Sequence, residues 1–526
     1  MDHTISGTKP LNKLFTYSQK LALALALAMA GAVLGAAAQT TSRLPNIGDG
    51  NSMSVPQEKR LGESIMRQLM RDPDYMDDPV LVDYLQSIWL PLRDAARQLG
   101  NLSPELDETF SWDLMLVRDR SVNAFALPGG FMGVHLGLIA VVSNKDELAG
   151  VMGHELSHVT QRHIARMQDS QSKQTPWLIG SFLLGVLAAS RSPDAANALI
   201  MGGTAGVAQG QLNFSRDMER EADRLGFAVS TQAGFEAQGV VSMFQKLAQA
   251  SRLNDSGGFP YLRSHPLTTE RIGDMQARIG VNAISTNSSV GTWEHVLIAG
   301  RAKALMSTRV EDIENLTKSY EAEQQTTEKN PQRQAMVAYA AAMGYAKQRS
   351  MDKARLAAQS LVPLVADDPV GLREVKWLLA DIERQAGNPN GCLNGLRDQH
   401  KQRAWVLLRA QCQLATKDIA MARSATENIQ LRLAQFPRDP LAWDMVAQAY
   451  EHIGQPLQAI RADAESRAVR WDEVAAIDRL RAGQELAKRL TQQGKMDLAA
   501  QQEANIIDSR LRALESIRLE LLRPQP

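Results

Sequence analysis

The chain has no net charge and few cysteines or aromatic residues. Its 526 residues include 58 Lys and Arg against 58 Asp and Glu, which excludes a bulk attraction for nucleic acid or an acidic surface. Two cysteines are too few for a cysteine-ligated zinc site, and aromatic residues make up only 5% of the chain. Ala, Leu, Gln and Arg are abundant instead, which favours helix. The length allows about two to four domains.

Residues 1–38 have the pattern of a secretory signal peptide. Three lysines form a basic n-region, an apolar run begins at Leu21, and small residues end at Ala38. The alternative is an uncleaved membrane anchor, because the run approaches spanning length. The Ala-rich run and its A-x-A ending favour cleavage near Ala38. We therefore expect the mature chain in the periplasm, an oxidising compartment.

The sequence H-E-x-x-H occurs once, as His154, Glu155 and His158. A helix is predicted over residues 145–167, with Ser143 or Asn144 as its N-cap. Residues four apart share a helix face, so the two imidazoles can bind one metal ion. Glu155 lies next to that face and can act as general base on a water. The alternative is a surface helix that contains these letters by chance.

A third metal ligand is needed, and residues 215–226 contain the candidates. This segment is predicted to start a helix, with Ser215 as its cap. Glu219 and Asp223 are four residues apart and share a face. Glu219 could bind the metal, while Asp223 could orient a ligand histidine. Taken alone, acidic residues in a first helical turn often only complement the helix dipole.

Two short strands are predicted ahead of the motif, over residues 110–117 and 122–127. If the second is a sheet edge, its free N–H and C=O groups can pair with an extended peptide. Four residues form this candidate substrate strand: Asn123, Ala124, Phe125 and Ala126. The alternative is an ordinary edge strand. Farther along, residues 176–210 are strongly apolar and could be core helices, a lid over the cleft or a peripheral membrane contact.

The C-terminal half is predicted to consist of paired helices. Asn330-Pro331, Asp368-Pro369 and Asp439-Pro440 recur at spacings close to one and two tetratricopeptide units. The positions of a tetratricopeptide repeat are matched in part by Trp443, Ala447, Tyr450, Gly454 and Ala459. The alternative is an unspecific helical bundle. In an exported protein, Cys392 and Cys412 could form a disulfide within this region.

Four segments together resemble the CAAX-prenyl-protease-like family of gluzincin metallopeptidases. They are H-E-L-S-H at 154–158, E-x-E-A-D-R-x-G at 219–226, the predicted strand and turn at 123–130, and S-H-P-x-x-x-E-R-I at 264–272. In that family the third ligand is the first Glu of E-x-E-A-D, which here is Glu219 rather than Glu221. The resemblance implies one zinc ion per chain, held by His154, His158 and Glu219. It also implies that His265 can reach the zinc, either as a latch in the open coordination position or as a group that stabilises the oxyanion.

The resemblance, taken with the signal peptide and helical tail, also implies a substrate and partners. It implies an exported endopeptidase that degrades misassembled outer-membrane barrel proteins and assists their assembly. The barrel-assembly machinery would be contacted through the repeat region. The alternative is a chaperone or scaffold with secondary proteolysis, because the repeat region occupies nearly half of the mature chain. A hydrolase of non-peptide substrates is a third, weaker hypothesis.

The expected architecture is mainly α. A signal peptide at 1–38 precedes an α+β zincin metalloprotease domain with a small sheet, over 39–285. An α-helical tetratricopeptide repeat array follows over 291–526.

Overall fold

The computed structural model describes most of the chain from residue 53 onward, and these residues belong to one compact unit. The described residues are 53–170, 216–253, 259, 261–279, 292–328 and 330–522. The predicted signal peptide at 1–38, the apolar residues 176–210 and the predicted cap Ser215 lie outside this set. Those predictions are therefore not tested by the structure.

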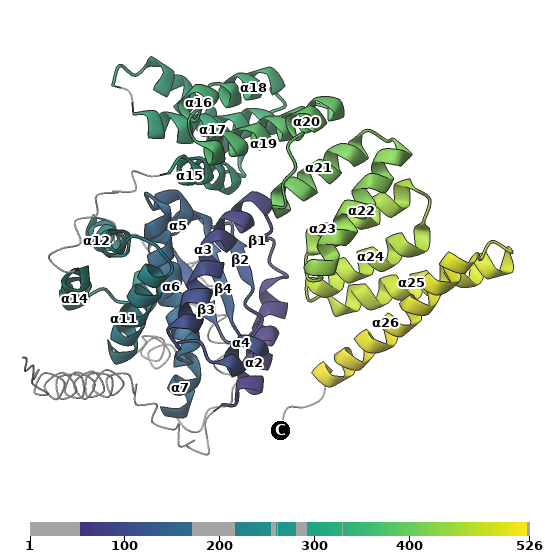
Figure 1. The fold of residues 1–526 in the computed structure, drawn as a ribbon, viewed down its shortest axis with the longest axis horizontal. Helices are drawn as coiled ribbons and strands as arrows, with labels where there is room; N and C mark the ends of the chain where they lie inside the picture. Colours follow the sequence, from purple (N-terminus) through teal and green to yellow (C-terminus); the bar gives the residue numbers. More distant parts are fainter. Residues whose placement is uncertain are drawn as a thin grey trace, which may run out of the picture. The chain divides into compact units, whose positions relative to one another are not determined.

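The described chain contains one small sheet of four strands (Figure 1). They are β1 (Tyr75–Met76), β2 (Leu114–Val117), β3 (Ala124–Leu127) and β4 (Phe131–His135). Their order is β1-β2-β4-β3, with β2 and β4 parallel and β3 antiparallel to β4. The turn between β3 and β4 contains Gly129 and Gly130 at φ 81° and 84°, a region that favours glycine. The strand predicted at 122–127 is present as β3, which begins only at Ala124, and it is a sheet edge.

The strand predicted over residues 110–117 is too long, because β2 begins only at Leu114. Phe110 instead ends the short helix α4 (Pro104–Thr109). Trp112 has a left-handed backbone with φ 55°, and its ring packs beside the rings of Phe110 and Trp89. At Phe110 and Trp112, the large apolar side chains belong to this buried aromatic cluster and not to a strand.

Helices surround the sheet, and α6 is the most deeply buried of those that carry the predicted site (Figure 1). Every residue of α6 after Lys145 is buried, and Asn144 caps its N-terminus by accepting a hydrogen bond from the Glu147 N–H. The helices of this region are α2 (Val55–Leu69), α3 (Pro79–Gln98), α5 (Leu136–Val141), α6 (Lys145–Thr160), α7 (His163–Ser170), α11 (Arg216–Gln232), α12 (Ala237–Leu253), α13 (Tyr261–Ser264) and α14 (Thr269–Ile279).

Helices α6 and α11 approach each other closely beside His154. A β-carbon at Gly226 would lie 2.8 Å from the His154 amide nitrogen, and one at Gly153 would lie 2.5 Å from Ser230 Oγ. Any larger residue at these two positions would push the helices apart. The Gly that ends the E-x-E-A-D-R-x-G segment therefore has a packing role: it lets α11 bring its carboxylates to α6.

The single helix predicted over 145–167 is interrupted. Helix α6 ends at Thr160, and α7 starts at His163. Arg162 between them has a left-handed backbone at φ 52°, and its Nε donates a 2.7 Å hydrogen bond to Glu58 Oε2. A second guanidinium nitrogen of Arg162 donates to the Met53 carbonyl. These contacts to the chain around α2 hold the break, and periodicity alone could not predict them.

The C-terminal region is helical, as predicted. Asn330, Asp368 and Asp439 are N-caps, each followed by proline at the first helical position. Assignment of these helices to tetratricopeptide repeats stays a prediction. The elements are α15 (Trp293–Met306), α16 (Val310–Gln325), α17 (Pro331–Lys347), α18 (Met351–Gln359), η1 (Val362–Leu364), α19 (Pro369–Gln385), α20 (Pro389–Gly395), α21 (Arg403–Ala415), α22 (Ile419–Gln435), α23 (Pro440–His452), α24 (Pro456–Val469), α25 (Glu473–Gln492) and α26 (Leu498–Leu522).

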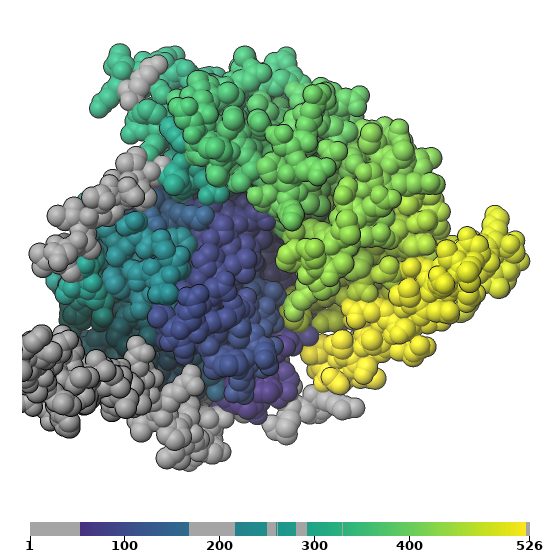
Figure 2. Space-filling view, viewed as in Figure 1, coloured from purple at the N-terminus to yellow at the C-terminus, as the bar shows by residue number. Residues whose placement is uncertain are grey.

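The C-terminal helices contact the N-terminal ones directly (Figure 2). Arg403 at the start of α21 donates to both carboxylate oxygens of Asp77, at 2.6 and 2.5 Å. The neighbouring Ala404 N–H donates to Asp83 in α3 at 2.7 Å. These polar contacts join the helical region to the helix that supports the sheet.

Cys392 and Cys412 form a disulfide in the structure, with their Cα atoms 6.0 Å apart. That the two are bridged in the exported protein remains a prediction. In the part of the chain that the structure describes, none of the helices combines the length and the apolar character needed to cross a bilayer.

Candidate metal centre

The two histidines of H-E-x-x-H point to the same place. His154 and His158 are both buried on α6, and their Nε2 atoms lie 3.0 Å apart. This is the arrangement that four-residue spacing on a helix predicts. The Nδ1 atom of each ring contacts another residue, so that the two Nε2 atoms face each other.

Glu219 from α11 completes a three-residue cluster with these histidines. Its Oε2 lies 3.5 Å from His154 Nε2, and its Oε1 lies 3.5 Å from His158 Nε2. His265, which follows α13, adds a fourth group, because its Nδ1 lies 2.9 Å from Glu219 Oε1. One ligand atom from each of the four residues falls within 4.8 Å of the others. The side chain of His265 is buried.

The donor set of this cluster fits zinc. A neutral imidazole has one donor and one acceptor nitrogen, and both Nδ1 atoms are engaged elsewhere. The two Nε2 atoms then face each other and a carboxylate, and His154 Nε2 also lies 3.4 Å from His265 Nδ1. A shared cation satisfies all three groups, and two imidazoles with one carboxylate form a usual set for catalytic zinc.

The charges around the cluster also favour a cation. Burial opposes the charge on Glu219, yet His265 and His154 beside it hold the pKa of that carboxyl well below its usual value. Burial also opposes protonation of His154, but its contacts with Asp223 and Glu219 raise the pKa of this imidazole to about 9. A metal ion has to displace that proton, so metal binding should weaken as the pH falls.

Asp223 and Arg271 contact the side chains of this cluster and orient them. His154 Nδ1 lies 2.9 Å from Asp223 Oδ1, as expected for a carboxylate that orients a ligand histidine. Arg271 on α14 donates two 2.7 Å hydrogen bonds to the Asp223 carboxylate, and a third guanidinium nitrogen lies 2.9 Å from Glu219 Oε2. Although burial alone would raise the pKa of Asp223, these hydrogen bonds lower it. No role for Arg271 was inferred from the sequence.

Glu155 lies between the cluster and the edge strand. Its Oε2 accepts a 3.1 Å hydrogen bond from the Ala126 N–H of β3, and its Oε1 lies 3.5 Å from His265 Nε2. Burial raises the pKa of Glu155, an effect that the nearby His265 and His154 partly offset. A carboxylate with a raised pKa accepts a proton more readily, which suits a general base.

The predicted substrate strand is therefore beside the site. Ala124, Phe125 and Ala126 lie in β3, and Asn123 immediately precedes it. The N–H of Ala126 points away from β4 and toward α6, where Glu155 accepts from it. The structure thus brings the candidate base and the sheet edge together.

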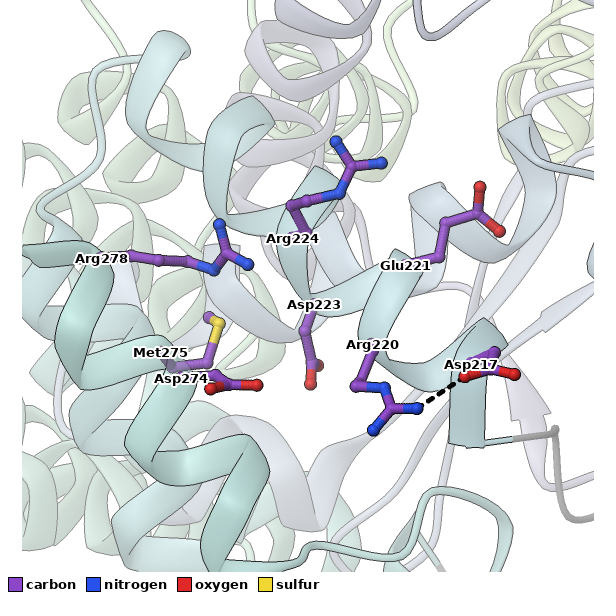
Figure 3. A pocket seen from close by; sticks show the side chains of 8 residues that line it. All are labelled: Asp217, Arg220, Glu221, Asp223, Arg224, Asp274, Met275 and Arg278. Carbon is purple, nitrogen blue, oxygen red and sulfur yellow. Dashed lines mark hydrogen bonds and ion pairs between the residues drawn. The ribbon is translucent and has the colours of Figure 1, made fainter.

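Glu221, the second glutamate of the E-x-E pair, does not join the cluster that could hold a metal. Figure 3 shows Glu221 and Asp223 leaving α11 in different directions, around a pocket lined by residues of α11 and α14. Glu221 instead contacts His163, which lies five residues after His158 and was given no role from the sequence.

Comparison with known proteins assigns the domain that carries this site. Residues 92–279 match peptidase family M48. This segment is a peptidase family M48 domain. It contains α6, α11 and α14, and hence all the groups that surround the cluster.

Several known proteins are similar to the chain. The beta-barrel assembly-enhancing protease of Escherichia coli is 28% identical over 442 residues, or 84% of this chain and 86% of that protein. A Vibrio cholerae protein provisionally named as such a protease is 36% identical over 237 residues, which is 45% of this chain but only 47% of that protein. The mitochondrial metalloendopeptidase OMA1 of Saccharomyces cerevisiae is 28% identical over 233 residues, 42% of this chain and 64% of that protein. The chain is thus similar to metalloproteases, as its motifs indicate.

Proposed function

We propose that this chain is a zinc-dependent endopeptidase of the periplasm that degrades misassembled outer-membrane barrel proteins and assists their assembly. One observation carries the proposal: His154, His158 and Glu219 converge on one buried point, with Glu155 between that point and an edge strand. The names of the bacterial relatives support the substrate, and the pattern of residues 1–38 supports export.

Zinc would be held by His154, His158 and Glu219, one ion per chain. When bound, it supplies a Lewis acid that polarises the scissile carbonyl and lowers the pKa of water. Glu155 takes the proton of the attacking water and passes it to the leaving amine. An extended substrate would pair with the edge of β3, so that its backbone is held beside Glu155. Asp223 keeps the His154 ring in place throughout.

A mainly chaperone or scaffold role is the second candidate. It is favoured by the extent of the helical region, which runs from α15 to α26 and contacts α3 through the Ala404 N–H. Paired helices can present a surface to barrel proteins or to the barrel-assembly machinery without any chemistry of their own. One protein can have both roles, and a variant that loses only catalysis distinguishes between them.

We expect one equivalent of zinc per wild-type chain, and much less than one in Glu219→Ala, because that variant loses a ligand. Elemental analysis of the purified full-length protein measures both. Asp217→Ala is the matched control, since Asp217 lies on the same helix and its side chain is 86% exposed. Full zinc in Glu219→Ala would reject this residue as a ligand, and absence of zinc from the wild type would reject the proposed function.

We further expect His265→Ala to cleave an unfolded substrate such as casein faster than the wild type, while keeping its zinc. His265 contacts both Glu219 and Glu155, so it occupies space that water and substrate need. Removing it should open the site and increase self-cleavage as well. The exposed His452→Ala is the control. If His265 stabilises the oxyanion instead, the variant would be slower by about 100-fold or more with intact zinc, and the latch hypothesis would be wrong.

A further inference from the structure

His163 is fully buried and makes polar contacts that the proposed reaction does not use. Its Nδ1 lies 2.8 Å from His158 Nδ1, and its Nε2 lies 3.0 Å from Glu221 Oε2. A buried imidazole placed between a candidate metal ligand and a carboxylate is more than a space-filling group, because it can accept a hydrogen bond from the ligand ring and donate one to the carboxylate.

We propose that His163 and Glu221 form a relay that holds His158 in its metal-binding orientation and tautomer. This inference rests on the proposed zinc site. When Nε2 of His158 binds a metal, the hydrogen of that neutral ring is on Nδ1 and has to be donated. His163 Nδ1 is placed to accept it. The hydrogen of His163 is then on Nε2, from which it is donated to Glu221. Each hydrogen bond of the relay then has a fixed donor: His158 donates to His163, and His163 donates to Glu221.

The break between α6 and α7 makes this contact available. In a continuous helix, a residue five positions after His158 would lie about 140° around the axis from it, on another face. The left-handed Arg162 ends α6 before that position, and α7 brings His163 back toward His158. The helix interruption therefore has a function: it places His163 where it can support His158 in the site.

Glu221 is fixed in turn by a charge from α7. Arg166 donates a 2.8 Å hydrogen bond to the same Glu221 Oε2 that His163 contacts. The two carboxylates of α11 thus serve different histidines: Asp223 orients His154, and Glu221 orients His158 through His163. Figure 3 shows the two side chains leaving the helix in different directions, as this division requires. His163 and Glu221 are positioning residues and do not touch the substrate.

The test is the zinc affinity of full-length variants, measured by competition with a colorimetric chelator. We expect His163→Ala to weaken zinc binding about 10- to 100-fold, the usual effect of losing such a support. His163→Asn should restore much of the affinity, because its amide oxygen can accept from His158 Nδ1. Glu221→Gln, which keeps an acceptor, should be milder than Glu221→Ala. Asp217→Ala and His452→Ala are controls for charge and for histidine content.

The absorption spectrum of the cobalt-substituted protein gives a second readout, which a merely structural role would not change. We expect the bands to shift in His163→Ala and to return toward the wild-type spectrum in His163→Asn. Wild-type zinc binding is measured first, and its absence overturns the proposed function itself. Wild-type affinity and an unchanged cobalt spectrum in His163→Ala overturn only the relay. Should His163→Ala fail to fold, equal affinity in Glu221→Ala and the wild type overturns it.

Discussion

Glu155→Gln is expected to keep its zinc and to lose about 10²- to 10⁴-fold in kcat on an unfolded substrate, the range for removal of a general base. Glutamine has nearly the same shape as glutamate, and its amide oxygen can still accept from the Ala126 N–H that contacts Glu155. It cannot take a proton from water. The loss should therefore appear in kcat, with KM little changed.

Initial rates on casein and elemental analysis of the same samples measure this expectation. Glu105→Gln, at an exposed site on α4, controls for the change in charge. Cleavage by Glu155→Gln at the wild-type rate would exclude Glu155 as the base. The same variant separates the two proposed roles in cells: a chaperone would still assist barrel assembly, whereas a protease would not.

The parts of the site that sequence could predict are those set by local geometry. The pairing of His154 with His158 follows from the pitch of one helix, and Glu219 and Asp223 follow from the pitch of another. That these two helices meet depends on Gly153 and Gly226, whose role is visible only when the helices are packed. The family resemblance supplied the pairing that periodicity could not.

The parts that sequence missed depend on tertiary contacts. Arg271 stands in a segment recognised by its S-H-P-x-x-x-E-R-I pattern, but nothing local indicates that it reaches Asp223, 48 positions earlier. His163 has no helical relation to His158 until Arg162 breaks the helix. The available signal in the sequence was His163 itself, a polar residue that lies next to the motif but shares no helix face with its histidines. The strand prediction was wrong at Trp112 for the same reason, because the aromatic cluster around this residue sets its backbone.

Arg271 links three parts of the site that are distant in sequence. It donates to Asp223 on α11, lies beside Glu219, and donates a 2.7 Å hydrogen bond to the Pro266 carbonyl, next to His265. Together with His154, its guanidinium lowers the pKa of the buried Asp223 carboxyl, while His265 and His154 lower the pKa of Glu219. It therefore stabilises a charge arrangement that would otherwise be costly in a buried site.

Arg271→Leu is expected to destabilise the contact between α11 and α14 by about 3–5 kcal/mol, the usual cost of removing one partner of a buried ion pair. Amide hydrogen exchange of the full-length protein measures this locally, because opening of α11 and α14 is read from their own peptides. Arg271→Lys keeps the charge but not the two-pronged contact with Asp223, so it should recover only part of the protection. Arg278→Leu, at an exposed position on the same helix, should exchange like the wild type. Wild-type protection of α11 in Arg271→Leu would show that other groups hold α11 in place, and that the contact with α14 does not depend on Arg271.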